Sequence, residues 1–350
     1  MTKAAEADFE ALLEFIRDDR GFDFTGYKRS TLGRRVRKRM QEVRVDGFAE
    51  YQEYLTHHPG EFTALFNTIL INVTGFFRDP EAWESLARGH LPRLLEKKAH
   101  GEVRVWSAAC ASGEETYTVA MLLCEALGTD RFYDQVKIYA TDVDEEALLQ
   151  ARAARYADHD LEAVPGALRA RYFERAGSHW AFRTDLRRQI IFGRHDLVRD
   201  APISHLDLLV SRNSLMYFNA ETQARIINRF HFALNDGGVL FLGKAEMMRH
   251  GSLFVPADLK ARIFVRGPRA SLRDRLMMIA QPQRGDGGER GAQALRLREA
   301  ALDAQLAAQI VVDAAGTLVL ANAAARSLFG LSGADEGRPL QDLPVSYRPV

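Results

Sequence analysis

The stretch RVWSAACASGEETY, Arg104 to Tyr117, begins with apolar residues typical of a buried strand and then turns to small residues, one glycine and two consecutive carboxylates. Folds that bind dinucleotides place several glycines at such a strand-to-helix turn, so that backbone amides can hold a pyrophosphate. Here only Gly113 is present, and Glu114 and Glu115 follow it. These carboxylates would repel a phosphate but attract a cation, unless they are only the acids common in the first turn of a helix.

A further acid, Asp142, lies about thirty residues downstream in YATDVD, where a second apolar run ends. An acid at the end of the second strand of a parallel sheet is placed to accept hydrogen bonds from ribose hydroxyls. A ligand that carries adenosine, a positive charge and no phosphate fits both features. S-adenosylmethionine, a sulfonium, is such a ligand.

The composition excludes several classes of protein. The 350 residues include 47 basic and 47 acidic ones, so no overall field favours nucleic acid or a membrane surface. Cys110 and Cys124 are too few for a disulfide framework or a cysteine-rich zinc site, and no metal site is expected. No apolar run approaches the ~20 residues that span a bilayer. We therefore expect a cytoplasmic protein without membrane insertion.

The hydrophobic pattern divides the chain into four parts. Residues 1–90 have apolar residues at helical spacing and predict a small all-α domain. Residues 91–267 alternate strands with helices, which predicts a doubly wound, mostly parallel, Rossmann-like α/β sheet, with a small antiparallel β insertion at 157–188. Residues 268–304 suggest a linker and a helix, and 305–350 a strand, turn, strand and helix. The predicted strands of the sheet are 102–109, 136–144, 189–196, 206–213, 238–244 and 261–267.

Three further segments complete a recognisable series. ILINVTGFFRDPEAW (residues 69–83) joins the helical part to the sheet, DLLVSRNSLMYFNAETQ (207–223) runs from a strand into a polar turn, and GGVLFLGKAE (237–246) follows. Together with the two segments above, they resemble in order and spacing the chemotaxis receptor methyltransferases, the CheR-type family. The resemblance covers residues 9–265 and implies a class I methyltransferase sheet that binds S-adenosylmethionine.

The resemblance also assigns roles to single residues. It places nine residues against the cofactor: Asn72, Thr74, Arg78, Glu115, Asp142, Asp196, Leu197, Arg212 and Asn213. In this assignment Asp196 and Leu197 flank the adenine, and Tyr217 completes the pocket near the reacting end. Without the resemblance, Arg78 beside Asp79 would indicate a surface ion pair, and Tyr217 a core aromatic residue with its hydroxyl hydrogen-bonded.

The implied reaction is transfer of a methyl group to a glutamate side chain of a chemoreceptor, giving a γ-methyl ester and S-adenosylhomocysteine. A glutamate with an unperturbed pKa near ~4.3 is already ionised at pH 7, so this nucleophile needs no general base. The motifs accordingly offer no histidine poised as a base, and His195 and His205 are expected to be structural. Because an anion and a sulfonium neutralise one another as the bond forms, the protein has to align them and exclude water. Arg78 and Tyr217 are predicted to orient the acceptor carboxylate and line the methyl path.

One segment is strongly basic although the whole chain is neutral. YKRSTLGRRVRKRMQEVR, residues 27–44, has eight basic residues and one acid. Its apolar residues fall on one helical stripe, Leu32, Val36, Met40 and Val43. Arg34, Arg37 and Lys38 face away from the stripe and form a basic ridge, which suits the glutamate-rich receptor bundle that the corresponding helix touches in the resembled family. The alternatives are a solvated helix face and a nucleic-acid surface, and the lack of interleaved aromatic residues disfavours the latter.

Two features depart from the family pattern. Some members tether to a receptor's C-terminal pentapeptide through the inserted hairpin, but here the turn ERAGSHW is short and lacks a glycine-rich loop, which argues against tethering. The segment IVVDAAGTLVLANAAARSLFG resembles the opening of a PAS sensor domain, with Asn322 in its AN.AA..LFG setting. Residues 305–350 would then be only the beginning of a PAS domain.

Two other functions stay open. One is a sensory scaffold that binds S-adenosylmethionine or its product without turnover, coupled to the PAS segment. The other is a methyltransferase for a small molecule. Arg78, Asn213 and Tyr217 favour an enzyme, because a scaffold needs no acceptor site, and the basic ridge disfavours a small acceptor.

Overall fold

The structure, a computed structural model, describes most of the chain. The described residues are 3–20, 22–70, 72–98, 101–246, 253–267, 308–313, 316–332, 335 and 337–343. They belong to two compact units, Met1–Pro268 and Arg269–Val350. Within the described residues, the structure contains no helix with the length and apolar character needed to cross a bilayer.

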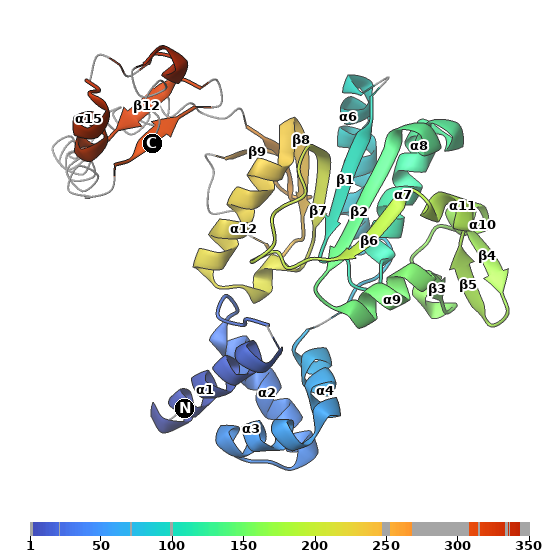
Figure 1. Ribbon diagram of the computed structural model, residues 1–350. Coiled ribbons are helices and arrows are strands. Elements are labelled where there is room, and N and C mark those ends of the chain that lie inside the picture. The colour runs from blue at the N-terminus through green and yellow to red at the C-terminus, as the bar shows by residue number, and fades with distance from the viewer. Residues whose placement is uncertain are drawn as a thin grey trace. The chain divides into compact units, whose positions relative to one another are not determined.

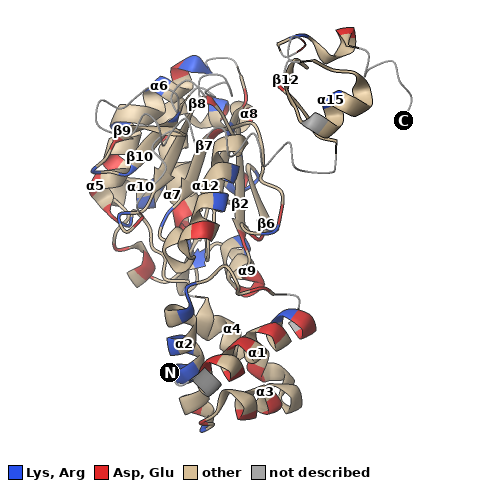
Figure 2. Cartoon of the chain, turned by 90° about the vertical axis from the view of Figure 1, so that its left-hand side faces the viewer, with Lys and Arg blue, Asp and Glu red and all other residues tan. Residues whose placement is uncertain are grey.

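The first unit begins with an all-α part (Figure 1). Its helices are α1 (Lys3–Arg20), α2 (Arg29–Val43), α3 (Phe48–His57) and α4 (Pro59–Ile69). Their apolar faces enclose one core, to which α2 contributes Leu32, Val36 and Met40. Figure 2 shows basic residues along α2 and acidic residues along α1 and α3. Three residues of the predicted apolar stripe are therefore buried in this core, and Val43 is partly buried against it.

The rest of the unit is built on a seven-stranded sheet with the order β6-β2-β1-β7-β8-β10-β9. The strands are β1 (Val103–Ala108), β2 (Val136–Asp142), β6 (Ile190–Arg194), β7 (Leu206–Ser211), β8 (Leu234–Leu242), β9 (Phe254–Asp258) and β10 (Ile263–Arg266). The first five strands in this order are parallel to one another. Strand β10 pairs antiparallel with β8 on one side and with β9 on the other. The predicted mostly parallel sheet is confirmed.

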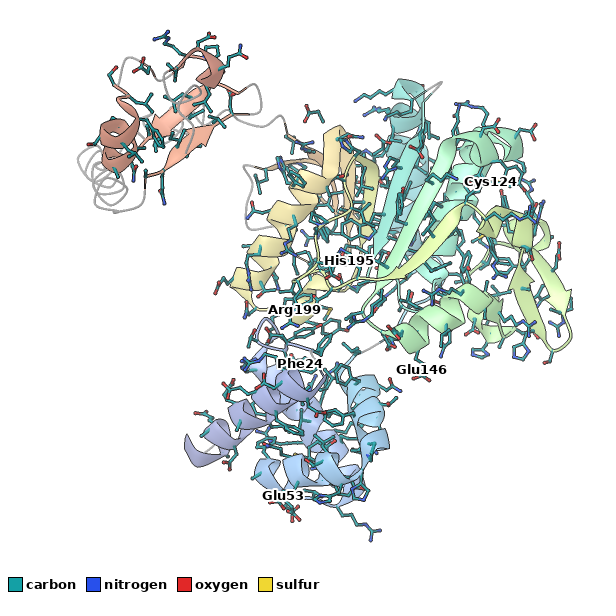
Figure 3. All side chains as sticks on the ribbon, in the orientation of Figure 1. Phe24, Glu53, Cys124, Glu146, His195 and Arg199 are labelled. Carbon is teal, nitrogen blue, oxygen red and sulfur yellow. The ribbon has the colours of Figure 1, made fainter. Side chains whose placement is uncertain are left out.

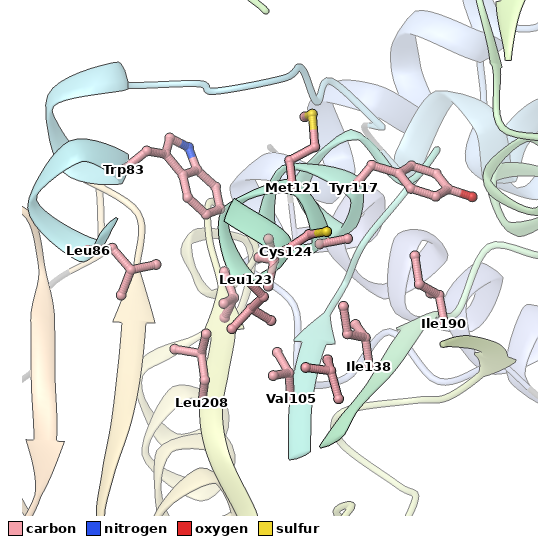
Figure 4. Close-up of a cluster of buried hydrophobic side chains, with 14 of the residues drawn as sticks. Trp83, Leu86, Val105, Tyr117, Met121, Leu123, Cys124, Ile138, Ile190 and Leu208 are labelled. Carbon is pink, nitrogen blue, oxygen red and sulfur yellow. The ribbon is translucent and has the colours of Figure 1, made fainter. Parts of the chain in front are cut away.

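Helices cover both faces of this sheet (Figure 1). They are α5 (Pro80–Ser85), a π-helical turn at Leu86–His90, α6 (Leu91–Lys97), α7 (Glu114–Leu127), α8 (Thr129–Gln135), α9 (Glu145–Ala153), a 3-10 turn at Leu215–Tyr217 and α12 (Ala220–Ala233). On one face, Trp83, Met121 and Leu208 belong to a large core formed with α7 (Figure 4). On the other, Trp106 and Phe230 of α12 form a second core. Side chains of β1 enter both cores because successive residues of a strand point to opposite faces.

A small antiparallel sheet follows α9, as predicted. Its strands are β3 (Arg155–Tyr156), β4 (Phe173–Ala176) and β5 (His179–Phe182), in the order β3-β5-β4. A 3-10 turn (His159–Leu161) and the short helices α10 (Gly166–Tyr172) and α11 (Thr184–Arg187) accompany them. Only Gly177 and Ser178 connect β4 to β5, so the hairpin turn is tight.

Several short elements were not predicted from the sequence, among them α8 and β9. Helix α8 is a single short segment, TDRFYDQ, whose polar composition hides its one buried residue, Phe132. Strand β9 contains Pro256, which lacks the backbone N–H that a central strand needs. Its place at the edge of the sheet makes this proline tolerable.

The all-α part docks on the sheet through polar contacts. The backbone N–H of Lys28 donates to the carbonyl of Tyr217 at 2.9 Å, and that of Asn219 donates to the carbonyl of Gly26 at 2.9 Å. Arg199 also lies 3.5 Å from Asp23. Figure 3 shows Arg199 and Phe24 on the two sides of this junction. The loop before α2 is thus fixed to the turn after β7.

The second unit contains the predicted strand, turn, strand and helix. They are β11 (Ile310–Val312), β12 (Leu318–Ala321) and α15 (Ala323–Phe329), and a 3-10 turn spans Leu340–Asp342. The side chain of Asn322 caps α15 by accepting from the N–H of Ala325 at 2.9 Å, and it also accepts from the N–H of Gln309 at 2.8 Å. The linker and helix predicted for residues 268–304 lie outside the described residues.

Replacing Gly113 is expected to destabilise the first unit. Its φ is +96°, and a Cβ atom there would lie 3.0 Å from the Cβ of Ala151. The left-handed backbone alone should cost Gly113→Ala about 1–2 kcal/mol of unfolding free energy, measured by urea denaturation. Gly166→Ala is the control, because no atom lies within 4 Å of its added Cβ. Equal stability of both variants would show that the turn can relax around a side chain.

Candidate active site

A pocket opens where the loops at the carboxyl ends of the parallel strands meet the all-α part. Its lining includes ten residues predicted from the sequence: Asn72, Thr74, Arg78, Glu115, Asp142, Asp196, Leu197, Arg212, Asn213 and Tyr217. They come from five separate segments of the chain. The basic ridge residues Arg34, Arg37 and Lys38 are exposed and lie outside this lining.

The loop between β1 and α7 forms the floor of the pocket. Its backbone takes the left-handed conformation at Ala109 (φ +62°), Ala111 (φ +47°) and Gly113. The carboxylate of Asp142 holds this loop by accepting from the N–H of Ala111 at 2.8 Å, and it accepts from the N–H of Asp144 at 3.0 Å. Burial raises the pKa of Asp142, although these backbone N–H groups oppose the shift. One carboxylate therefore organises two loops and still borders the pocket.

The two consecutive acids that open α7 have different surroundings. Glu115 lines the pocket, and its carboxylate accepts from Ser107 Oγ at 3.0 Å. Burial raises the pKa of Glu115 to about 7, against the opposing charge of Arg212. Glu114 instead accepts from Ser112 Oγ at 2.8 Å, and burial raises its pKa as well. Only the second acid faces the pocket, so the helix-terminus interpretation describes Glu114 alone.

Arg212 clamps the turn that carries Arg78. Its guanidinium donates to the carbonyl of Arg78 at 2.7 Å and to Asp79 Oδ2 at 2.8 Å. It packs against the rings of Trp83 and Phe241, with its Cζ 5.1 and 4.8 Å from their centroids. The Asp79 carboxylate is thus paired with Arg212, so the alternative of an Arg78–Asp79 surface ion pair is wrong.

The Arg78 side chain itself is exposed at the pocket. Its Nη1 donates to the carbonyl of Val73 at 2.8 Å, in the segment that joins α4 to the sheet. Asn72, in the same segment, donates to Asp144 at 2.7 Å. This connection keeps the segment close to the end of β2.

The all-α part contributes residues that the sequence analysis missed. Tyr27, Thr31 and Arg35 line the pocket. Arg35 Nη1 donates to the carbonyl of Ile69 at 2.7 Å, its guanidinium lies 5.6 Å from the ring centroid of Tyr217, and burial lowers its pKa. One signal was available, because Arg35 lies three residues after Leu32 and so belongs to the inward side of α2.

His195 also borders the pocket (Figure 3). Its backbone N–H donates to the carbonyl of Asp142 at 2.9 Å, its Nε2 is hydrogen-bonded to the carbonyl of Ala201 at 3.0 Å, and its ring lies edge-on to Trp106. Its Nδ1 is buried without a hydrogen-bond partner among the described residues. The His195 ring is thus held at the pocket wall by the Ala201 carbonyl and the Trp106 ring.

Family comparisons agree with this arrangement. Residues 72–262 match the CheR methyltransferase SAM-binding domain, and residues 7–70 match the CheR methyltransferase all-alpha domain. The chain belongs to the CheR methyltransferase family. The CheR match makes it an S-adenosylmethionine-dependent methyltransferase. The matched ranges end at residue 262, so they give no support to the PAS resemblance.

Named relatives include two CheR-type enzymes. The chain is 35% identical to a chemotaxis protein methyltransferase of Listeria monocytogenes over 253 residues, which are 72% of this chain and 93% of that protein. It is 31% identical to the chemotaxis protein methyltransferase of Escherichia coli over 256 residues, 70% of this chain and 86% of that protein. It is also 38% identical over 227 residues to an uncharacterized 104.1 kDa protein of Rhodobacter capsulatus, but spans only 24% of its length.

Proposed function

We propose that this CheR-family protein transfers the methyl group of S-adenosylmethionine to glutamate side chains of chemoreceptors, giving γ-methyl esters and S-adenosylhomocysteine. One observation carries the proposal: a pocket with two buried acids and no glycine-rich phosphate cradle is closed by a helix with a basic outer face. The chemotaxis protein methyltransferases among the relatives support it. The proposed place of action is the cytoplasm, where such receptor segments would be accessible.

The donor set of the pocket fits S-adenosylmethionine, which when bound supplies an electrophilic methyl group on a sulfonium. We assign the ribose hydroxyls to Asp142, whose oxygens retain lone pairs beyond their two backbone hydrogen bonds. Glu115 would accept from the cofactor's ammonium group, and Asp196 and Leu197 would flank the adenine. The remaining cofactor residues of the proposal are Asn72, Thr74, Arg78, Arg212 and Asn213. Of these, Arg212 is proposed to act by fixing the Arg78 turn, since its two terminal nitrogens donate to Arg78 and Asp79, while its buried Nε has no hydrogen-bond partner among the described residues.

The acceptor end lies where Arg78 and Tyr217 meet Arg35 of the all-α part. An exposed guanidinium such as that of Arg78 can leave the Val73 carbonyl to pair with the acceptor carboxylate. A carboxylate oxygen forms the new bond to the methyl carbon while the carbon–sulfur bond breaks, so no proton has to be removed. Arg78 and Tyr217 orient the carboxylate, and the docked helices exclude water.

The proposed partner is the glutamate-rich helical bundle of a chemoreceptor. Arg34, Arg37 and Lys38 are exposed on α2, and in the part of the chain that the structure describes none of them forms an ion pair. Arg39 is different, because it is held by Glu61 at 2.6 Å. Pentapeptide tethering is not part of the proposal, since the β4–β5 turn is tight. Nucleic acid is not proposed as a partner.

Residues 305–350 are proposed to begin a PAS-like domain. The order of β11, β12 and α15 and the Asn322 cap support this, because they match the resembled segment. A sensory scaffold coupled to this domain is the alternative to an enzyme. An experimental structure of this region would test the assignment, and any fold other than PAS would remove it.

Asp142→Ala is expected to weaken S-adenosylmethionine and S-adenosylhomocysteine alike, because both carry the same ribose. Losing a charged hydrogen-bond acceptor should cost about 1.5–3 kcal/mol, roughly a ten- to hundredfold rise in Kd by calorimetry. Asp207→Ala is the matched control. Asp207 is also a buried acid, but it lies near the start of β7, whereas the pocket residues follow the end of that strand. Unchanged affinity for both ligands would remove Asp142 from the site.

Arg78→Lys and Tyr217→Phe are expected to lower turnover more than cofactor affinity. Loss of alignment should reduce kcat about ten- to a hundredfold, a larger factor than the rise in the Kd for S-adenosylhomocysteine. The assay incubates methyl-labelled cofactor with receptor-containing membranes and scores base-labile methanol, which carboxyl esters release. Arg88→Lys and Tyr54→Phe, outside the pocket lining, serve as controls.

The same assay separates the candidate functions. Wild-type protein that binds the cofactor but methylates no receptor from its own organism would contradict the proposal and support the scaffold. Label recovered on a small molecule instead would support the third candidate.

Reversing the basic ridge is expected to weaken receptor use alone. Arg34→Glu, Arg37→Glu and Lys38→Glu together should raise the KM for receptor, and the wild-type rate at low receptor concentration should fall with salt as the ~10 Å Debye length at 0.1 M contracts. Cofactor Kd should not change. A control reversal of Arg93, Lys97 and Arg188 alters charge on exposed residues outside the pocket. Equal receptor KM in both triple variants would show the ridge to be only a solvated face.

A further inference from the structure

Glu246 is a buried carboxylate just beyond the end of β8, with 3% of its surface exposed. Its Oε1 accepts from the backbone N–H groups of Ser214 at 2.8 Å and Leu215 at 2.7 Å. Its Oε2 accepts from the N–H of Gly243 at 2.6 Å. The carboxylate therefore joins the turn after β7 to the loop after β8.

The turn that Glu246 holds has an unusual backbone and close neighbours. Asn213 has a φ of +62°, a left-handed conformation that few residues other than glycine and asparagine adopt readily. A Cβ at Gly243 would lie 2.7 Å from the backbone nitrogen of Asn213, so the two loops touch. A bridging acceptor is needed to keep them together, because their N–H groups are buried and have to be hydrogen-bonded. The same turn ends at Tyr217.

Glu246 is one of a group of charged residues at the pocket, of which Glu115, Arg212 and Glu246 itself are buried. Its charge acts on Glu115 of α7 and on Arg212 of the β7 turn, and Arg78 and Asp79 complete the set around Arg212. Ser107 and Cys110 of the β1 side also face Glu115. Burial raises the pKa of Glu246, whereas its backbone N–H donors lower it. As a like charge, Glu246 also raises the pKa of Glu115.

We propose that Glu246 is a positioning residue for methyl transfer, which holds the turn from Arg212 to Tyr217 in its productive shape and adds negative charge beneath Glu115. The proposal rests on the proposed function for its effect on turnover. Its effect on Glu115 is independent of any acceptor. Glu246 touches neither the acceptor nor the pocket surface, because the pocket lining does not include it.

Glu246→Gln tests both effects. The variant has nearly the same size, but its amide turns a donor toward backbone N–H groups and removes the charge. At pH 8, kcat should fall about tenfold or more from misplacement of Tyr217, while the Kd for S-adenosylhomocysteine stays within about twofold. Glu246→Asp, whose carboxylate is shorter but still charged, should recover the cofactor behaviour and only part of kcat.

The pH dependence of cofactor binding gives a second test. If Glu246 only stabilised the fold, its replacement would not change the pH midpoint of binding. Glu115 is neutral below its raised pKa of about 7, so affinity for the ammonium of S-adenosylhomocysteine should fall as pH drops through that value. Without the neighbouring charge, Glu115 ionises more easily, and the midpoint in Glu246→Gln should move to lower pH. Calorimetry from pH 5.5 to 8.5 measures this midpoint.

Glu61→Gln is the matched control. Glu61 is also a buried carboxylate, held by Arg39 and Tyr51 at 2.6 and 2.7 Å, but it lies in the all-α part outside the pocket lining. It should lose stability without a shift of the binding midpoint. An unchanged midpoint in Glu246→Gln, or a kcat loss no larger than in Glu61→Gln at equal folded fraction, would overturn the proposal. If wild-type protein methylates no receptor, the proposed function fails, and the midpoint alone still decides the role of Glu246.

Discussion

The hydrogen bond from the N–H of Ala111 to the carboxylate of Asp142 is the contact on which the site depends. It ties the loop after β1 to the end of β2, and that loop has three left-handed residues within a few positions. Such backbone persists only where the surroundings fix it. The loop then delivers Glu115 to the pocket at the first turn of α7. One carboxylate thus organises the backbone of this loop and also lines the pocket, where it is proposed to hold the ribose of the cofactor.

The pocket is lined by both acidic and basic side chains, which are proposed to serve different ligands. Glu115, at the start of α7, and Asp142, at the end of β2, suit a cationic cofactor, whereas Arg78 and Arg35 line the pocket where an anionic acceptor is proposed to enter. Arg212 lies between them, buried and held by Asp79. A buried charge is costly unless it is paired and hydrogen-bonded, which accounts for the number of contacts that Arg212 and Glu246 make. The all-α part contributes to both the wall and the charge, so methyl transfer is proposed to need both parts of the unit.

The sequence predicted the fold where hydrophobic periodicity was strong. The parallel strands are continuous apolar runs, so their order could be predicted from the sequence, as could the candidate acids Glu115 and Asp142 that follow or end two of them. The other pocket residues were assigned through the family resemblance. Arg35 was missed because one basic residue among eight looks like its neighbours, and only the register of α2 against α4 turns it inward. Glu246 was missed because its partners are backbone groups of a turn about thirty residues away. Strand β9 was hidden by Pro256, which an edge position tolerates.

The central claim is that this pocket holds S-adenosylmethionine, with Asp142 and Glu115 binding the cofactor and Arg78 near the proposed acceptor. A crystal structure of the wild-type protein with S-adenosylhomocysteine bound tests it most directly. The account predicts ribose hydroxyls on Asp142, the ammonium group on Glu115, and the sulfur on the side of Arg78 and Tyr217. Ligand bound with its homocysteine end directed away from Glu115, or bound outside this pocket, would contradict it.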